Sequence, residues 1–171
     1  MGRPKELDQP AIARDEAYLQ EALALAREAE RAGEVPVGAV VVIENRIIGR
    51  GRNAVITLRD PTAHAEILAL REAARELANY RLPGASLYTT LEPCPMCAGA
   101  LVQARIERLV FGARDIRYGG VRSKFRLADS PLLNHRAEVV EGVLGADCTQ
   151  LLLDFFAARR SAANPDGQPQ E

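Results

Sequence analysis

Two short segments of this sequence carry side chains that bind metal ions or transfer protons. The first is His64-Ala65-Glu66, and the second, further along the chain, is Pro93-Cys94-Pro95-Met96-Cys97. One imidazole and two thiolates suit Zn²⁺, and three protein ligands leave the fourth tetrahedral position open, as in catalytic zinc sites. We therefore predict that His64, Cys94 and Cys97 hold one Zn²⁺ per chain.

The spacing within each segment supports a common site. Cys94 and Cys97 are three residues apart, so both thiols can face one ion from the first turn of a helix, a position that also suits Pro95. Free backbone N–H groups at a helix start favour the thiolate form. Glu66 lies two residues from His64, and we predict that it is the catalytic acid and base that takes a proton from water and passes it on.

Each residue also has a simpler interpretation. A Cys-x-x-Cys pair alone occurs in redox proteins and as half of a structural zinc knuckle, and a Glu at a helix start often only compensates the helix dipole. The sequence has no second Cys-x-x-Cys or His pair to complete a knuckle. His-x-Glu followed by Pro-Cys-x-x-Cys is characteristic of zinc-dependent deaminases of nucleobases, so we expect a hydrolase of that class.

The overall composition indicates one globular domain. The 171 residues are 47% hydrophobic and 26% charged, ordinary values for a soluble protein, with no apolar run long enough to span a membrane and no secretory signal. Three cysteines, an odd number, favour a reducing cytoplasm over a disulfide framework. The net charge of −1 implies that a nucleic acid would be bound by a local patch rather than by overall charge.

Hydrophobic periodicity predicts strands that alternate with helices, and hence an α/β domain with helices covering a sheet. We expect residues 1–10 to be a flexible N-terminal arm, 11–160 the zinc-dependent deaminase domain and 161–171 a disordered C-terminal tail. The predicted helices are 11–31, 60–77, 95–103 and 146–160, and the predicted strands are 35–43, 46–50, 87–91, 109–111 and 138–140.

From about Ala17 to Arg160 the sequence resembles the bacterial tRNA-specific adenosine deaminases (TadA) of the cytidine/deoxycytidylate deaminase superfamily. The matching stretches are 34–40 (Glu-Val-Pro-Val-Gly-Ala-Val), 60–67 around His64, 91–100 around Cys94, 110–115 (Val-Phe-Gly-Ala-Arg-Asp), 134–136 (Asn-His-Arg) and 154–156 (Asp-Phe-Phe). The resemblance implies a three-layer α/β/α cytidine-deaminase-like domain with a five-stranded mixed sheet. It also implies a homodimer that binds a tRNA anticodon stem-loop and converts adenosine to inosine at wobble position 34.

The resemblance also implies residue roles. His64, Cys94 and Cys97 match the zinc ligands and Glu66 the proton shuttle. The expected substrate contacts are Asn53, the backbone N–H of Ala65, Asp115 near the target ribose, and the aromatic pair Phe155 and Phe156 near the anticodon loop.

Residues 116–126 depart from the family pattern, because bulky and basic side chains replace a glycine- and alanine-rich stretch. Cations interleaved with Tyr118 and Phe125 suit a single-stranded RNA loop, so Arg117, Arg122 and Lys124 are further candidates, although a solvated charged loop is the simpler reading. Two alternative functions remain: a free nucleobase or nucleoside deaminase of the guanine or cytosine type, and a non-catalytic zinc protein that binds RNA. An intact Glu66 argues against the latter.

Overall fold

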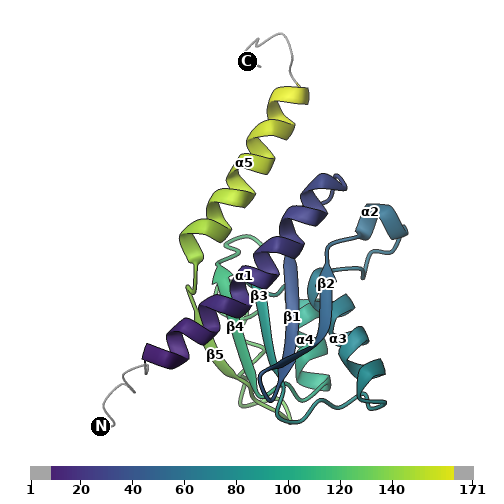
Figure 1. Ribbon diagram of the computed structural model, residues 1–171, viewed down its shortest axis with the longest axis vertical. Coiled ribbons are helices and arrows are strands. Elements are labelled where there is room, and N and C mark those ends of the chain that lie inside the picture. The colour runs from purple at the N-terminus through teal and green to yellow at the C-terminus, as the bar shows by residue number, and fades with distance from the viewer. Residues whose placement is uncertain (1–8, 164–171) are drawn as a thin grey trace.

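The computed structural model describes residues 9–163, in which one sheet is covered by helices on both faces (Figure 1). The elements in chain order are α1 (Gln9–Arg31), β1 (Gly38–Ile43), β2 (Arg46–Arg52), α2 (Val55–Leu58), α3 (Ala65–Glu76), β3 (Ser86–Leu91), α4 (Pro95–Gln103), β4 (Arg108–Ala113), β5 (Glu138–Glu141) and α5 (Gly145–Ala163). This arrangement confirms the predicted three-layer α/β/α domain.

The sheet is mixed, with the strand order β2-β1-β3-β4-β5. Strand β1 is antiparallel to both β2 and β3, whereas β3, β4 and β5 are parallel to one another. The start of β1 therefore lies at the same edge of the sheet as the ends of β2, β3 and β4. Chain segments that are far apart in sequence meet at this edge, which is where sheets of this kind bind ligands.

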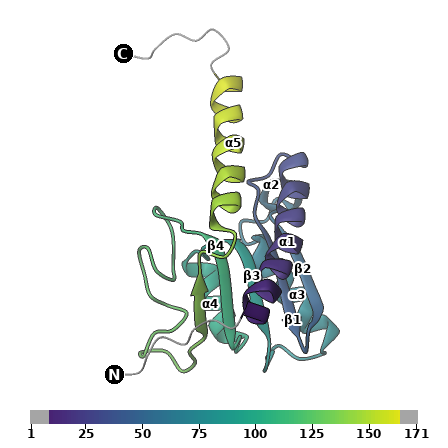
Figure 2. The same cartoon turned by 60° about the vertical axis from the view of Figure 1, so that its left-hand side comes forward.

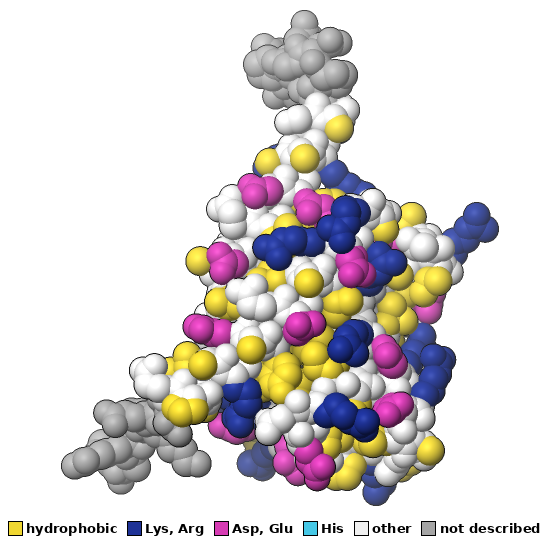
Figure 3. Space-filling model, viewed as in Figure 1, with side chains coloured by type: hydrophobic (Ala, Val, Ile, Leu, Met, Phe, Trp, Pro, Cys, Tyr) yellow, Lys and Arg dark blue, Asp and Glu magenta, His cyan; other side chains and the backbone are white. Residues whose placement is uncertain are grey.

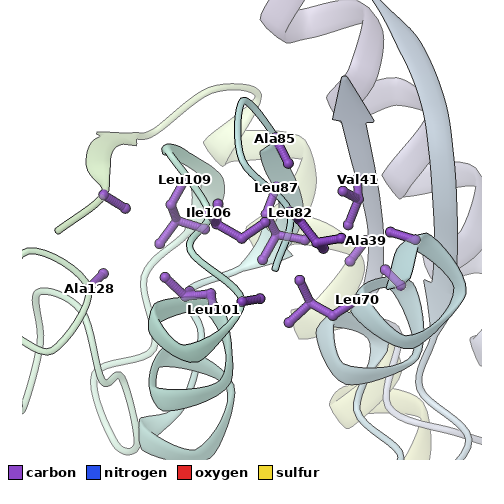
Figure 4. Packing of buried hydrophobic residues seen from close by; sticks show 14 of the residues in the cluster. Ala39, Val41, Leu70, Leu82, Ala85, Leu87, Leu101, Ile106, Leu109 and Ala128 are labelled. Carbon is purple, nitrogen blue, oxygen red and sulfur yellow. The ribbon is translucent and has the colours of Figure 1, made fainter. Parts of the chain in front are cut away.

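Alternating side chains of the buried strands serve two separate cores. Val40 and Val42 of β1 face the layer of α1 and α5, while Ala39 and Val41 face the layer of α3 and α4. Figure 4 shows the core between the sheet and the layer of α3 and α4, in which Leu70 of α3 and Leu101 of α4 lie on the same side of the strand residues Leu87 and Leu109. Since both faces of the central strands are covered, β1 and β4 are nearly continuous in hydrophobic character, which explains the β-branched run of β1.

Helix α3 approaches β2 unusually closely because the strand offers glycines where the helix passes. A Cβ atom on Gly51 would lie 2.0 Å from the carbonyl oxygen of Ala65, and one on Gly49 would lie 2.2 Å from that of Ala69. Only residues without a side chain fit at such distances. The contact fixes the start of α3 against the end of β2.

A buried ion pair holds α1 against the opposite face. Asp15, 2% exposed, accepts hydrogen bonds from both terminal nitrogens of Arg108 on β4 at 2.7 Å and from the Tyr88 hydroxyl on β3 at 3.0 Å. At the other end of the molecule α5 projects beyond the sheet (Figure 2). None of the described helices is long and apolar enough to cross a membrane.

The structure differs from the sequence expectations in four places. The strand expected from Val35 begins at Gly38. The helix expected from Asp60 begins at Ala65, because the Asp60 carboxylate instead accepts hydrogen bonds from Thr62 in the preceding turn. The one-turn helix α2 was not expected. Helices α1 and α5 extend to Gln9 and Ala163, into the segments predicted as arm and tail, whose remaining residues lie outside the described range.

Candidate active site

Two helix starts bring the predicted metal ligands together. His64 is the residue immediately before α3, Cys94 is the residue immediately before α4, and both have extended backbone conformations. Cys97 lies in the first turn of α4, and Pro95 occupies the first helical position, where its missing N–H is not needed. The sequence pattern therefore places an imidazole and two thiols at neighbouring positive ends of helix dipoles.

The distances between the three ligand atoms fit a zinc ion. Nδ1 of His64 lies 3.6 Å from Sγ of Cys94 and 3.5 Å from Sγ of Cys97, and all three atoms lie within 4.8 Å of one another. Tetrahedral zinc, with Zn–N and Zn–S bonds of about 2.0 and 2.3 Å, separates nitrogen and sulfur ligands by roughly 3.6 Å. The chain thus provides three ligands at zinc spacing, which is the number found in catalytic sites.

Hydrogen bonds among the ligands favour a thiolate even without metal. Contacts with Cys97 and His64 lower the pKa of Cys94 to about 4, while the hydrogen bond to Cys94 raises the pKa of His64. The hydrogen bond between Cys97 and Cys94, together with burial, raises the pKa of Cys97. A cation that binds here would replace these protons.

Glu66 lies beside the ligands without belonging to them. It occupies the first turn of α3, is 4% exposed, and lines the same cavity as His64 and Cys94. Burial raises the pKa of its carboxyl to about 7, because a charged carboxylate is poorly solvated there. Its position allows proton exchange with a molecule held next to the ligands.

The cavity, which we call the metal pocket, has a volume of about 480 Å³. Its walls are mostly apolar, with a few polar groups that converge, as is usual for small-molecule sites. It is lined by Glu34, Val35, Val37, Asn53, Val55, Ile56, His64, Glu66, Leu91, Glu92, Cys94, Pro95, Asp115 and Tyr118. Five of the predicted site residues line this pocket: His64, Glu66, Cys94, Asn53 and Asp115. Cys97 does not line it, but its sulfur lies next to the ligand atoms of His64 and Cys94.

Asn53 and Ala65 contact each other at the pocket. The Asn53 carboxamide oxygen accepts a hydrogen bond from the backbone N–H of Ala65 at 3.0 Å, which satisfies the first amide of α3. Ala65 is fully buried and does not line the metal pocket. The amide expected to face the base edge is thus held by Asn53, and the predicted base contact of Ala65 stays a prediction.

The carboxylate of Asp115 shapes the chain that follows β4. One of its oxygens accepts hydrogen bonds from the backbone N–H groups of Arg117 and Tyr118, each at 3.0 Å. Asp115 therefore closes a turn while it lines the metal pocket. Its expected position near the target ribose is compatible both with the turn that it closes and with its place in the pocket wall.

A second cavity of about 580 Å³, the outer groove, lies between α5 and residues 113–118. Val35, Leu91, Asp115 and Tyr118 line both cavities, so the outer groove continues from the metal pocket. Phe156 lines this groove, as do three basic side chains, Arg114, Arg117 and Arg160.

Phe155, by contrast, is buried behind Phe156. Its ring lies 4.8 Å from the guanidinium of Arg159 and contacts the ring of Phe156 edge-on. The structure thus separates the aromatic pair into one packed ring and one ring at the groove.

The three lower-ranked basic candidates also occupy different environments. Arg117 lines the outer groove, and Lys124 lies exposed in the following loop. Arg122 is only partly exposed and pairs with Asp129 at 3.2 Å, so its charge is already matched. Figure 3 shows that the α1 face carries basic and acidic side chains intermixed, with no single-sign patch.

Two buried carboxylates at the pocket were given no role by the sequence reasoning. Glu34, 2% exposed, accepts hydrogen bonds from the backbone N–H and hydroxyl of Thr57 at 2.7 and 2.9 Å, and so holds α2 in place as a pocket wall. Glu92, 1% exposed, follows β3. A buried Glu is costly unless hydrogen-bonded, but in a sequence it looks like any surface Glu.

Known proteins share this fold and site. Residues 12–113 match the family model described as the cytidine and deoxycytidylate deaminase zinc-binding region. The chain is 53% identical to the tRNA-specific adenosine deaminase of Haemophilus influenzae, over 85% of each chain. It is 48% identical to that of Bacillus subtilis, over 87% of this chain and 92% of the relative.

Solved structures of related deaminases have the same fold as this chain. One from a study of tRNA:A34 deaminases that edit the wobble position superposes with a TM-score of 0.77 at 44% identity, over 80% of this chain and 99% of the other. A guanine deaminase from Nitrosomonas europaea superposes with a TM-score of 0.72 at 28% identity, over 91% and 94% of the two chains. This chain therefore belongs to the cytidine and deoxycytidylate deaminase zinc-binding family, and within it to the tRNA-specific adenosine deaminases.

Proposed function

We propose that this protein is a zinc-dependent hydrolase that deaminates adenosine to inosine at position 34 of a tRNA anticodon. The observation that carries the proposal is the triad of His64, Cys94 and Cys97 at zinc spacing, with buried Glu66 beside it in one pocket. The curated relatives named tRNA-specific adenosine deaminase support the choice of substrate.

The residues of the metal pocket would have different roles in the reaction. His64, Cys94 and Cys97 would hold zinc, which supplies Lewis-acid activation of water at that position. Glu66 would take one proton from the water and deliver it to ring N1 of the base as the remaining hydroxyl oxygen bonds to C6. It would then take the second proton from that hydroxyl and pass it to the amino group, which leaves as ammonia when the C6–N bond breaks. Asn53 and Asp115 line the pocket where a base turned out of the anticodon loop would enter.

The outer groove supports an RNA substrate rather than a free base. It leads away from the metal pocket and combines the ring of Phe156 with the cations of Arg117 and Arg160. Aromatic rings and cations together suit the splayed nucleotides of a single-stranded loop. A free nucleobase would fill only the inner cavity.

The deciding experiment measures inosine formation in an anticodon stem-loop with adenosine at position 34. A stem-loop with the adenosine moved to position 35 is the matched control, and free adenosine, cytidine and guanine are tested beside it. Conversion of the first RNA alone is the expected result. Release of ammonia from guanine with the RNA unchanged would instead favour the free-base alternative, which the structural likeness to a guanine deaminase keeps relevant.

We also infer that the protein is a cytoplasmic homodimer. Exposed apolar side chains, among them Ile56 and Tyr118 at the pocket and Phe125 in the loop that follows Tyr118, are consistent with a partner surface. The cysteines of the described chain are unpaired, which fits a reducing compartment. Light scattering coupled to size-exclusion chromatography tests the dimer, for which a mass of about twice the 18.6 kDa of one chain is expected.

A further inference from the structure

Glu92 lies at the junction between β3 and the metal-binding turn. It follows the last strand residue, Leu91, and precedes Cys94 by two positions. Its backbone N–H donates to the carbonyl of Ala113 at the end of β4, at 2.8 Å. The residue is 1% exposed, and its carboxylate accepts hydrogen bonds from the segment that follows β4, residues 115–123.

One carboxylate accepts five hydrogen bonds from that segment. Oε1 accepts the backbone N–H groups of Val121, Arg122 and Ser123 at 3.1, 2.6 and 2.9 Å. Oε2 accepts the backbone N–H of Asp115 at 3.0 Å and the Ser123 hydroxyl at 2.5 Å. Hydrogen bonds to a charged acceptor are roughly twice as strong as neutral ones, so a single side chain holds both ends of the loop.

Two consecutive glycines let the loop lie directly on the metal-binding turn. A Cβ atom on Gly119 would lie 2.3 to 2.5 Å from the carboxyl atoms of Glu92. A Cβ atom on Gly120 would lie 2.7 Å from the backbone nitrogen of Pro95 and 2.8 Å from the carbonyl carbon of Cys94. The Gly120 N–H also donates to the Pro93 carbonyl at 2.7 Å.

The loop held in this way carries two residues of the metal pocket, Asp115 and Tyr118, which also line the outer groove. We propose that Glu92 is a positioning residue: through residues 115–123 it sets the rim over which the substrate enters the metal pocket. This inference rests on the proposed function, because the rim matters only for a substrate that passes it. Glu92 itself is not required to touch the substrate.

The substitution Glu92→Gln tests the proposal with little change in shape. The carboxamide oxygen can still accept the three amides of residues 121–123, and the Ser123 hydroxyl can rotate to accept from the new NH₂ group. The N–H of Asp115 would then face a donor instead of an acceptor. The variant therefore loosens the loop at the residue that lines the pocket.

Asp15→Asn provides the matched control. Asp15 is likewise a buried carboxylate that accepts several hydrogen bonds, but it lies under α1 and lines neither the metal pocket nor the outer groove. Both substitutions remove one buried negative charge. A general loss of stability would appear in both variants, whereas loss of rim positioning would appear only in Glu92→Gln.

Hydrogen exchange, zinc content and steady-state kinetics on the adenosine-34 stem-loop are measured for the zinc-loaded protein and both variants. In Glu92→Gln we expect amide 115 to exchange at least tenfold faster and amides 121–123, which keep an acceptor, to change less, with zinc still at one per chain. Because rim contacts bind ground and transition states alike, KM should rise by about tenfold while kcat changes less than about threefold. Asp15→Asn should melt at a lower temperature with exchange in the loop and KM within about twofold of the parent.

Several results would overturn the proposal. The first is an unchanged KM or unchanged hydrogen exchange of the loop in Glu92→Gln. The second is an equal rise of KM in Asp15→Asn. The third is loss of zinc from Glu92→Gln, which would show that the substitution acts on Cys94 instead. If Glu92→Gln fails to fold, Gly120→Ala displaces the loop from Cys94 and Pro95 with the carboxylate intact and should raise KM likewise. If the parent does not convert the stem-loop, the proposed function fails, and loop exchange alone then decides the role of Glu92.

Discussion

Replacing Gly51 by alanine should disturb the active site from the far side of α3. The added Cβ would lie 2.0 Å from the carbonyl oxygen of Ala65 and 2.6 Å from the nitrogen of Ala69, whereas ordinary contact begins at 3.4 Å. Both atoms belong to the helix backbone, so relief requires the start of α3 to move outward by about 1 Å. His64 and Glu66 flank Ala65 and would move with it.

A displacement of about 1 Å at reacting groups can cost on the order of 100-fold in rate, and overpacking costs roughly 1–3 kcal/mol of stability. We expect Gly51→Ala to lower kcat by about 100-fold and to lose zinc to a chelator faster than the parent. Turnover of the adenosine-34 stem-loop, zinc retention and urea denaturation measure these effects.

Gly99→Ala is the control for this substitution, because nothing lies within 4 Å of a Cβ at Gly99, in the middle of α4. It should leave activity unchanged and raise the free energy of unfolding by about 0.5–1 kcal/mol. Parental kcat and zinc retention in a folded Gly51→Ala protein would refute the claim that the glycine contact positions the catalytic helix.

Three further predictions concern single carboxylates. Glu66→Ala should retain one zinc per chain by metal analysis yet lose at least about 10³-fold in turnover, because the other carboxylates that line the pocket, Glu34, Glu92 and Asp115, already accept hydrogen bonds from backbone N–H groups; near-parental activity would exclude that role. Asp15→Asn should lower the free energy of unfolding in urea by about 3 kcal/mol, since the partly buried Arg108 charge loses its nearer partner, at 2.7 Å, and retains Glu138 at 3.6 Å; a change under about 1 kcal/mol would contradict this. Hydrogen bonds from Arg126 and Arg122 hold the pKa of Asp129 at about 2, below its ordinary 3.8, so its stabilisation is complete above about pH 4 and is lost as the pH falls toward 2. The urea midpoints of the parent and Asp129→Asn should therefore converge as the pH falls from about 4 to about 2, and a constant gap over that range would show that Asp129 titrates normally.

Local signals in the sequence were sufficient for most elements. Helix α4 has the predicted bounds because Pro95 at its first position and the apolar run after it define the helix without tertiary help. The turn between β1 and β2 was likewise predictable, since Glu44 and Asn45 both adopt positive φ, at 48° and 62°, as a two-residue hairpin turn requires. The metal ligands were predictable because His-x-Glu followed by Pro-Cys-x-x-Cys is characteristic of zinc-dependent nucleobase deaminases.

The elements that the sequence did not predict depend on partners distant in the chain. Four residues are too few for a periodic signal, and α2 is held by hydrogen bonds that Thr57 donates to the carboxylate of Glu34, 23 positions away. Asp60 is a residue type that often precedes a helix, but here its carboxylate accepts a hydrogen bond from Thr62 within a turn. The contacts of Glu92 with residues 115–123 likewise arise only when β3 and β4 pair side by side.

The position of the ligands at two separate helix starts has a thermodynamic consequence. A zinc ion held by His64, Cys94 and Cys97 would cross-link α3 to α4 and close a loop of the chain between them, in the manner of a disulfide but reversibly. Free energy gained by metal binding then adds to folding, and each tenfold rise in free zinc above the dissociation constant contributes about 1.4 kcal/mol. The melting temperature of this protein should accordingly depend on the concentration of free zinc. Zinc depletion would then lower its stability as well as its activity.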